Sequence, residues 1–167
     1  IYLAETLVAA GGYRPFVALG SEVPFPFAVE SSRIQVAGIP PEASSAHPLL
    51  ESWGVASRLA SGGAFAGCYR GYVTELAARW LEASSPAEVA ETAIYACGPT
   101  PMLRSVARLA HRFGIPAQVS LEEFMACAVG GCAGCAVEVL TPEGPAMKRV
   151  CVDGPVFDAA AVFPPGL

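Results

Sequence analysis

The chain is poor in charged residues and has no long apolar run. Only 15% of its 167 residues are charged, while 53% are hydrophobic. This composition excludes a disordered tail and predicts a folded protein with a buried core. No apolar stretch reaches the roughly 18 to 20 residues of a membrane-spanning helix, and no basic segment precedes a short apolar one as in a secretory signal. We therefore expect a soluble, cytoplasmic protein with no membrane partner.

Basic residues and histidines are also scarce. Ten Lys and Arg face 15 Asp and Glu, for a formal net charge of -5, and the basic residues are scattered, whereas a nucleic-acid partner usually requires a basic stripe. His47 and His111 lie too far apart in the sequence to suggest a metal pair, and neither has a carboxylate and a nucleophile at triad spacing. We expect no nucleic-acid partner and no catalytic triad.

Residues 1–121 alternate helical spacing with short apolar runs, the pattern of a parallel sheet covered by helices. The chain begins with Ile1 rather than Met, so we expect it to lack the start of its protein. The predicted helices are residues 1–10, 71–81 and 100–113, and the predicted strands are residues 15–19, 33–37, 55–59 and 92–97. The fold class is therefore α/β over residues 1–121.

After residue 121 the sequence changes to small residues, glycines and cysteines, which cannot form a packed helix or strand of ordinary length. This change predicts a domain boundary and a small second domain over residues 122–167. Residues 136–140 and 147–151 read as the two strands of a hairpin, joined by a turn rich in Pro and Gly.

Four of the six cysteines crowd into this second segment. Cys127, Cys132 and Cys135 follow the spacing C-x4-C-x2-C, and Cys151 comes later in the chain, at the end of the predicted hairpin. This is the plant-type spacing for a [2Fe-2S] cluster. Glycines near the cysteines permit a close wrap with backbone N–H groups aimed at the sulfurs, and charged side chains are absent from residues 125–137. The pattern predicts a cluster held by these four thiolates.

Two other uses of the same cysteines remain open. A zinc site usually takes two short Cys-x2-Cys knuckles, and this chain has one. A redox pair of the thioredoxin kind, Cys132 with Cys135, would leave Cys127 and Cys151 without a role. Cys68 has no ligand-spaced neighbour and is expected to be a structural or incidental thiol.

A second candidate site follows the predicted strand at residues 92–97. Cys97, Gly98 and Pro99 lie between that strand and a helix, at the position where open α/β sheets bind ligands. By spacing alone these residues are an ordinary strand-to-helix turn.

Three segments together resemble a known family. Residues 95–103 (YACGPTPML) are similar to the C-G-P-x-x-M motif of the ferredoxin-NADP reductase superfamily. Residues 120–135 and 148–157 resemble the cysteine segment and the closing segment of the electron-transfer subunit of the NAD-dependent dihydroorotate dehydrogenase. The resemblance covers most of the chain and is weakest between residues 20 and 71.

The resemblance implies a path of electrons in pyrimidine biosynthesis. NADH would reduce FAD, FAD would pass electrons to the [2Fe-2S] cluster, and the cluster would exchange them with FMN in a separate dihydroorotate dehydrogenase catalytic subunit, within a hetero-oligomer. It places Cys97, Gly98 and Pro99 beside the nicotinamide. The flavin-binding β-barrel and the Gly-rich pyrophosphate loop of the family are not in this sequence, so FAD is expected in the complete subunit.

Smaller expectations and rival functions follow. Glu22 lies where the nucleotide ribose would sit and would favour NAD over NADP, or it is simply a solvated residue. Glu122 and Glu123 are more commonly solvated than placed beside a flavin. The alternatives are a flavin and iron-sulfur subunit of a ferredoxin-linked NAD(P) oxidoreductase or of a hydrogenase, and a zinc-stapled module without enzymatic activity.

Overall fold

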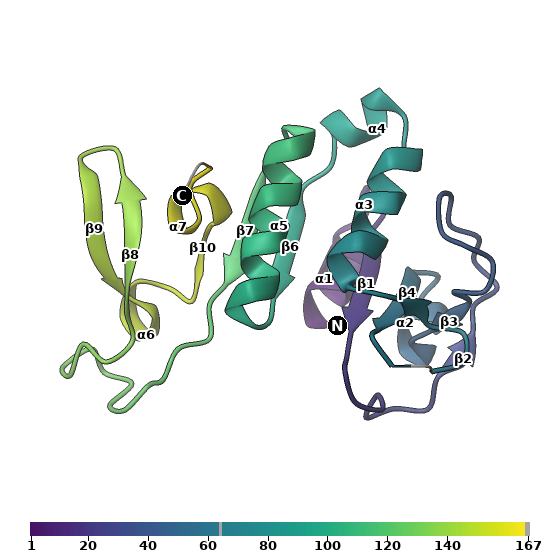
Figure 1. Ribbon diagram of the computed structural model, residues 1–167, viewed down its shortest axis with the longest axis horizontal. Coiled ribbons are helices and arrows are strands. Elements are labelled where there is room, and N and C mark those ends of the chain that lie inside the picture. Colours follow the sequence, from purple (N-terminus) through teal and green to yellow (C-terminus); the bar gives the residue numbers. More distant parts are fainter. Residues whose placement is uncertain (64, 166–167) are drawn as a thin grey trace. The chain divides into compact units, whose positions relative to one another are not determined.

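The computed structural model describes residues 1–63 and 65–165. The chain forms two compact units, Ile1–Ser85 and Pro86–Leu167, each with its own sheet (Figure 1). The two units divide after Ser85. The boundary predicted after residue 121 separates a nucleotide-binding segment from a cluster-binding segment, and it stays a prediction. Within the described ranges, no helix has the length and apolar character needed to cross a membrane.

The first unit is built on a parallel sheet in the order β1-β4-β5. Its elements, in chain order, are α1 (Tyr2–Ala10), β1 (Phe16–Gly20), β2 (Glu30–Ser31), β3 (Ser45–Ala46), α2 (Pro48–Ser52), β4 (Ala56–Ser61), β5 (Tyr69–Arg70) and α3 (Val73–Ala83). The predicted helices at residues 1–10 and 71–81 and strands at residues 15–19 and 55–59 are confirmed, with shifts of one or two residues.

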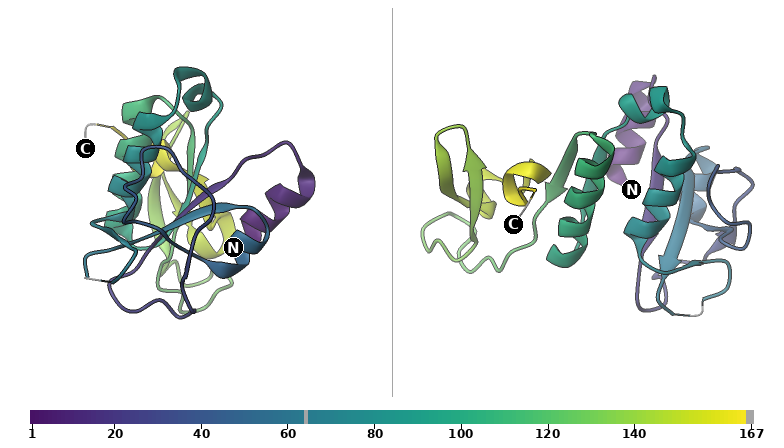
Figure 2. Two further views of the ribbon diagram at one scale, coloured as in Figure 1. Left: turned by 90° about the vertical axis from the view of Figure 1, so that its right-hand side faces the viewer. Right: turned by 45° about the horizontal axis from the view of Figure 1, so that its top comes forward.

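Successive side chains of β1 pack on opposite sides of this sheet. Val17 packs against a buried cluster of Ala4, Leu50 and Val55, which comes from α1, α2 and the start of β4. Its neighbour Phe16 contacts the ring of Trp80 in α3, with centroids 5.1 Å apart. The alternation is the period of two expected of a strand with helices on both faces, and Figure 2 shows α1 and α3 on either side of β1.

The predicted strand at residues 33–37 is wrong. Strand β2 ends at Ser31, after pairing with β3. Beyond it, the Ser32 hydroxyl and the Arg33 backbone N–H donate to the buried carboxylate of Glu51, at 2.8 and 2.6 Å. The Arg33 backbone N–H is therefore paired with a side chain instead of with a neighbouring strand. For this reason the strand-like composition of residues 33–37 does not produce a strand.

Glycine is required at position 38 by its surroundings as well as by its backbone angle. Gly38 has φ +75°, and a Cβ there would clash with the carbonyl oxygen of Arg79 and the methyl of Ala83 in α3. Gly54 has φ +73° but open space around it. We expect Gly54→Ala to lower the free energy of unfolding by about 1 kcal/mol and Gly38→Ala by about 2 kcal/mol.

Urea unfolding followed by tryptophan fluorescence measures both variants. The two tryptophans of the chain, Trp53 and Trp80, both lie in the first unit, so the signal reports on that unit. Equal losses for the two variants would mean that the clash with α3 costs nothing beyond the strained backbone angle.

The second unit carries a sheet in the order β10-β7-β6. Its elements, in chain order, are α4 (Pro86–Ala90), β6 (Ile94–Cys97), α5 (Thr100–Phe113), β7 (Ala117–Ser120), β8 (Ala136–Thr141), β9 (Gly144–Arg149), α6 (Val150–Asp153), β10 (Val156–Asp158) and α7 (Ala159–Val162). Strands β6 and β7 are parallel, and β10 adds to β7 in the antiparallel direction. The predicted strand at residues 92–97 and helix at residues 100–113 are confirmed.

Helix α5 shows why its prediction succeeded. Pro101 stands in its first turn, where a missing N–H costs nothing, and Gly114 closes it in the left-handed conformation, with φ 66°. Its apolar face is buried through Leu103, Val106 and Ala110. Both ends and the buried face are thus encoded locally in the sequence.

The predicted hairpin is confirmed, but its second strand lies earlier than the predicted residues 147–151: β9 ends at Arg149, and Val150 and Cys151 belong to α6. Strands β8 and β9 pair from Ala136 opposite Arg149 to Thr141 opposite Gly144, which leaves Pro142 and Glu143 as the turn. The turn is thus two residues long and includes a proline, as its composition indicated. The hairpin is the element that positions the fourth cysteine.

Candidate functional site

The hairpin brings Cys151 to Cys135, although 15 residues separate them in the sequence. Cys135 directly precedes Ala136, the first paired residue of β8, and Val150 directly follows Arg149, the last of β9. The backbone N–H of Val150 donates to the Cys135 carbonyl at 3.1 Å, which extends the ladder by one step. Cys151 then enters the short helix α6 beside the buried Cys135.

Hydrogen bonds link the Cys135 and Cys151 side chains and set which of them ionises first. The backbone N–H and the thiol of Cys151 lower the pKa of Cys135. In return, the hydrogen bond and the charge of Cys135 raise the pKa of Cys151, together with its burial. The pair therefore holds one thiolate more readily than two, as expected when like charges approach without a cation.

The other two cysteines form a second pair in the loop between β7 and β8. Backbone N–H groups of Val129 and Cys132, together with the Cys132 thiol, lower the pKa of Cys127 to about 6. The N–H of Gly134 donates to the Cys132 sulfur at 3.3 Å. Backbone donors aimed at cysteine sulfurs stabilise the thiolate form, which is the form that ligates iron or zinc.

The loop adopts left-handed backbone angles, but mostly not at its glycines. Ala128 has φ 56° and Ala133 has φ 54°, while among the predicted glycines only Gly130 has a positive value, φ 81°. Gly131 and Gly134 do not need the freedom that their residue type allows. A positive φ is unfavourable for alanine, so contacts in the surrounding turn must offset this strain. Strained backbone angles of this kind are typical of functional loops.

The structure does not gather the four cysteines into one ligand set. They lie as two pairs, and across residues 1–63 and 65–165 no group of three or more His, Cys, Asp or Glu side chains is placed to hold a metal ion. The charge of Cys127 is the smallest of the causes that raise the pKa of Cys151. Four thiols with N–H donors fit an iron-sulfur cluster, and the ligand set stays a prediction.

Gly130 is where the loop meets the helix of Cys151. A Cβ at this position would lie 2.7 Å from Cγ2 of Val152 and 3.2 Å from an Arg149 nitrogen, whereas nothing lies within 4 Å of a Cβ at Gly131. We expect Gly130→Ala to lower the iron bound per chain to less than half of the wild-type value and Gly131→Ala to leave it unchanged. Iron determination on equal amounts of protein decides this, and equal retention by both variants would contradict it.

The second predicted site lies at the carboxyl end of the parallel strands β6 and β7. Cys97 ends β6, Gly98 has φ 153°, and Pro99 caps α5. A Cβ on Gly98 would lie 2.7 Å from the methyl group of Met102, so the glycine and the methionine of the motif pack against each other. The three residues thus sit where such sheets bind ligands, and their contact with a nucleotide stays a prediction.

Glu122 belongs to this edge, which the sequence did not indicate. The Cys97 thiol donates to its Oε1 at 3.4 Å. Burial first, and then this carboxylate, raise the pKa of Cys97. The expectation of a merely solvated Glu122 is incomplete, because the side chain is exposed yet hydrogen-bonded. Only the parallel pairing of β6 with β7, which sets Cys97 opposite Ser120, brings these residues together.

The remaining predicted residues are placed but carry no chemistry here. Glu22 is exposed, just after the carboxyl end of β1, and its role toward a ribose stays a prediction. Cys68 is half-buried as a free thiol, and burial raises its pKa, in keeping with a structural residue.

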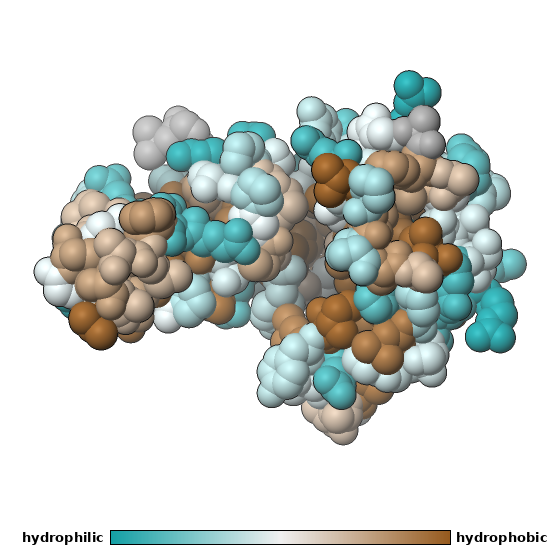
Figure 3. Space-filling view, turned by 90° about the horizontal axis from the view of Figure 1, so that it is seen from below, coloured by the Kyte–Doolittle hydropathy of each residue, from teal (hydrophilic) through white to brown (hydrophobic). Residues whose placement is uncertain are grey.

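The cysteine loop exposes large apolar side chains. Phe124 and Val129 are 83% and 80% exposed. The part of Figure 3 that shows this loop, at the left, is mostly white to brown, with few hydrophilic residues. Exposed apolar side chains near the cysteines suit contact with a partner protein.

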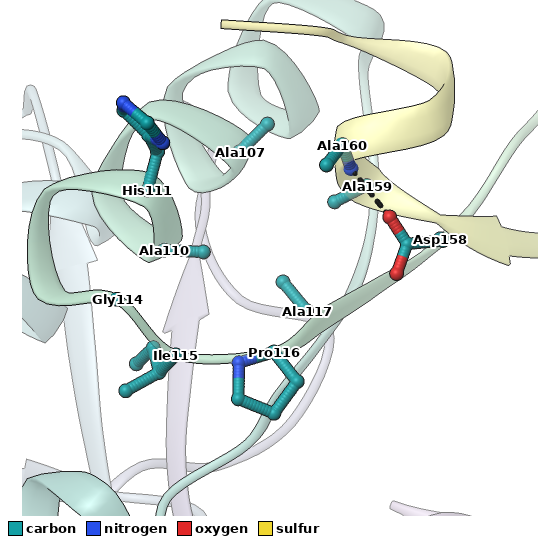
Figure 4. A pocket seen from close by; sticks show the side chains of 10 residues that line it. All are labelled: Ala107, Ala110, His111, Gly114, Ile115, Pro116, Ala117, Asp158, Ala159 and Ala160. Carbon is teal, nitrogen blue, oxygen red and sulfur yellow. Dashed lines mark hydrogen bonds between the residues drawn. The ribbon is translucent and has the colours of Figure 1, made fainter. Parts of the chain in front are cut away.

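A cavity of about 240 Å³ in the second unit lies apart from the cysteines (Figure 4). It is lined by the C-terminal half of α5 and the start of α7, and includes His111 and Asp158. The Asp158 carboxylate accepts from the backbone N–H groups of Ala160 and Ala161, at 2.8 and 3.2 Å. Its charge therefore caps α7, and we assign the cavity no reaction.

A known family model matches part of the second unit. Residues 122–163 match the family model of the iron-sulfur cluster binding domain of dihydroorotate dehydrogenase B. Three relatives carry the name dihydroorotate dehydrogenase B (NAD(+)), electron transfer subunit. The one from Caldanaerobacter subterraneus subsp. tengcongensis is 48% identical over 70 residues, which are 42% of this chain and 28% of the relative.

The two others have similar coverage. The relative from Bacillus caldolyticus is 53% identical over 70 residues (41% of this chain, 26% of the relative). That from Desulforamulus reducens is 36% identical over 89 residues (53% of this chain, 32% of the relative). The matched region thus spans about a third or less of each relative. The resemblance predicted from the sequence is confirmed for this region, including an iron-sulfur binding domain.

A solved structure extends the likeness of fold to nearly the whole chain. An NADH-dependent reduced ferredoxin-NADP oxidoreductase, described for flavin-based electron bifurcation, superimposes with a TM-score of 0.66 at 23% identity. The match covers 96% of this chain and 48% of that structure. The predicted α/β fold with a parallel sheet is therefore confirmed, and it is similar to the fold of that structure.

Proposed function

We propose that this chain acts within an electron-transfer subunit of an NAD-dependent dihydroorotate dehydrogenase. It binds a [2Fe-2S] cluster through Cys127, Cys132, Cys135 and Cys151, and it works with NADH, FAD and a partner subunit that carries FMN and the dihydroorotate chemistry. The observation that carries the proposal is the hairpin that returns Cys151 to Cys135, within a segment matched as an iron-sulfur cluster binding domain.

When bound, the cluster supplies one-electron transfer between two-electron carriers. The chain's own residues hold and tune it. Thiolates provide the ligands, and N–H groups such as that of Gly134 spread the negative charge of the sulfurs. The exposed apolar side chains of Phe124 and Val129 provide a surface on which the partner subunit docks close to the cluster. Cys97, Gly98 and Pro99 form the edge at which the nicotinamide nucleotide binds.

The first test uses the chain purified without oxygen, with iron, sulfide and zinc measured on one sample alongside its visible absorption and low-temperature EPR spectra. Two irons and two sulfides per chain, with a rhombic EPR signal on reduction, support the proposal. A colourless protein that holds zinc without sulfide contradicts it and favours a zinc-stapled module.

The partner is tested separately. An affinity-tagged chain is mixed with an FMN-containing dihydroorotate dehydrogenase subunit and recovered by its tag. Retention of FMN on the tagged protein, measured by flavin absorbance after release, supports the assembly. Failure to retain it, by a chain that holds its cluster, would favour a different oxidoreductase partner.

A further inference from the structure

Arg149 connects the loop of the first three cysteines to the element that carries the fourth. It is the last residue of β9, opposite Ala136, and it directly precedes the helix that contains Cys151. Its side chain does not follow the hairpin. Instead, Nη1 donates to the backbone carbonyl of Gly130 at 3.0 Å, across 19 residues of sequence.

Gly130 also lies against the helix that carries the fourth cysteine. A Cβ at Gly130 would lie 2.7 Å from Cγ2 of Val152, the residue after Cys151, and 3.2 Å from Arg149 Nη1. One residue of the loop thus binds Arg149 through its carbonyl and packs against the helix of Cys151. A shift of the Arg149 side chain would therefore be felt at a cysteine.

Asp153 fixes the direction of the Arg149 side chain. Its Oδ2 accepts from the Arg149 backbone N–H at 2.7 Å and lies 3.6 Å from the side-chain Nε. The two side chains are 44% and 31% exposed, so the ion pair by itself stabilises little. Its effect is to orient the guanidinium fork toward Gly130, which a flexible ammonium on a lysine would not reproduce.

We infer that Arg149 is a positioning residue for the iron-sulfur cluster, because it joins the cysteine loop to the helix of Cys151 and brings a positive charge to that loop. The inference rests on the proposed function. A cation near a cluster favours the reduced state, which carries one more negative charge, so Arg149 raises the reduction potential. The tie at Gly130 slows loss of the cluster.

The test compares Arg149→Gln with Lys148→Gln in the whole chain. Lys148 is the neighbouring residue on β9 and pairs with Val137, so its replacement removes the same charge without touching Gly130. Iron and sulfide are measured on each protein, loss of the cluster absorbance is followed in excess chelator, and the midpoint potential is taken from an EPR-monitored redox titration. A third variant, Arg149→Lys, keeps the charge and loses the fork.

We expect Arg149→Gln to lose its cluster about 10- to 100-fold faster than wild type, the range typical of outer-shell ligand partners, and to have a more negative midpoint potential. Lys148→Gln should stay close to wild type in both. Arg149→Lys should recover the potential but not the retention. The potential is the readout that a purely structural role would leave unmoved.

Equal behaviour of Arg149→Gln and Lys148→Gln in both measurements would overturn the inference. A potential for Arg149→Lys as negative as that of Arg149→Gln would overturn its electrostatic part. Failure of the proposed function is distinguishable from either result, because the wild-type chain would then hold neither iron nor sulfide.

Discussion

Cys132→Ser is expected to abolish the iron and acid-labile sulfide of the purified chain, with loss of its visible absorption. Cys132 pairs with Cys127 in the loop, where its thiol and backbone both favour the Cys127 thiolate. A serine hydroxyl has a far higher pKa than a thiol and is a poor ligand for a cluster that Cys thiolates hold. Because the loop is exposed at Cys132, the replacement leaves the core intact.

The matched control is Cys68→Ser, which removes a half-buried thiol from the first unit. It should keep two irons and two sulfides per chain. A normal cluster spectrum in Cys132→Ser would count heavily against the four-cysteine ligand set.

The same measurement on Cys151→Ser separates the cluster from a thioredoxin-like pair. Cys151 has no part in a Cys132 and Cys135 disulfide, but it is the fourth ligand of the proposed cluster. We expect Cys151→Ser to lose its iron as Cys132→Ser does. Reversible two-thiol oxidation that survives in Cys151→Ser, without iron in the wild type, would favour the redox pair instead.

Removal of the buried carboxylate at position 51 should cost the first unit about 3 kcal/mol of unfolding free energy. Glu51 is only 6% exposed and accepts from the Ser32 hydroxyl and the Arg33 backbone. Its charge also supports Arg58, which is equally buried. Glu51→Ala therefore leaves the donors of residues 32 and 33 without their acceptor and Arg58 without compensation.

Glu51 stabilises the first unit through its charge as well as through its hydrogen bonds. Burial lowers the pKa of Arg58, and the Glu51 carboxylate partly offsets this. Arg58 donates to the carbonyls of Ile34 and Ser57, at 2.6 and 2.7 Å. It therefore holds the same segment from which Glu51 accepts the Ser32 hydroxyl and the Arg33 backbone N–H. Glu51→Gln keeps the shape and removes the charge, and its loss should be smaller than that of Glu51→Ala.

The unfolding midpoints of the Glu51 variants are measured by urea unfolding monitored by tryptophan fluorescence. Glu22→Gln, in the exposed loop after β1, removes the same charge from the surface and should change the midpoint little. A midpoint for Glu51→Ala equal to that of Glu22→Gln would mean that the segment at residues 32–34 is held by other contacts.

Local signals explain what could be predicted from the sequence. Helix α5 carries a proline in its first turn, a glycine at its end and one apolar face, and each signal acts within a few residues. The hairpin from Ala136 to Arg149 likewise follows from two short strands around a Pro-containing turn. The cysteine spacing in the loop is a chemical signal that does not depend on the fold.

The failures concern partners that are distant in sequence. Residues 33–37 have the composition of a strand, and only the carboxylate of Glu51, contributed by α2, changes their outcome. Glu122 meets Cys97 because two parallel strands place them at one edge. Arg149 reaches Gly130 across the cysteine loop. No window of neighbouring residues contains these contacts.

The hairpin that closes at Ala136 and Arg149 has a consequence for how the metal centre assembles. Formation of the hairpin already costs the entropy of closing the chain between Cys135 and Cys151. The Cys151 thiol is therefore at a high effective concentration relative to Cys135. In the proposed cluster, Cys151 would thus be held near Cys135 before any iron binds. The ligands that would still have to approach this pair are Cys127 and Cys132, in the loop that precedes the hairpin.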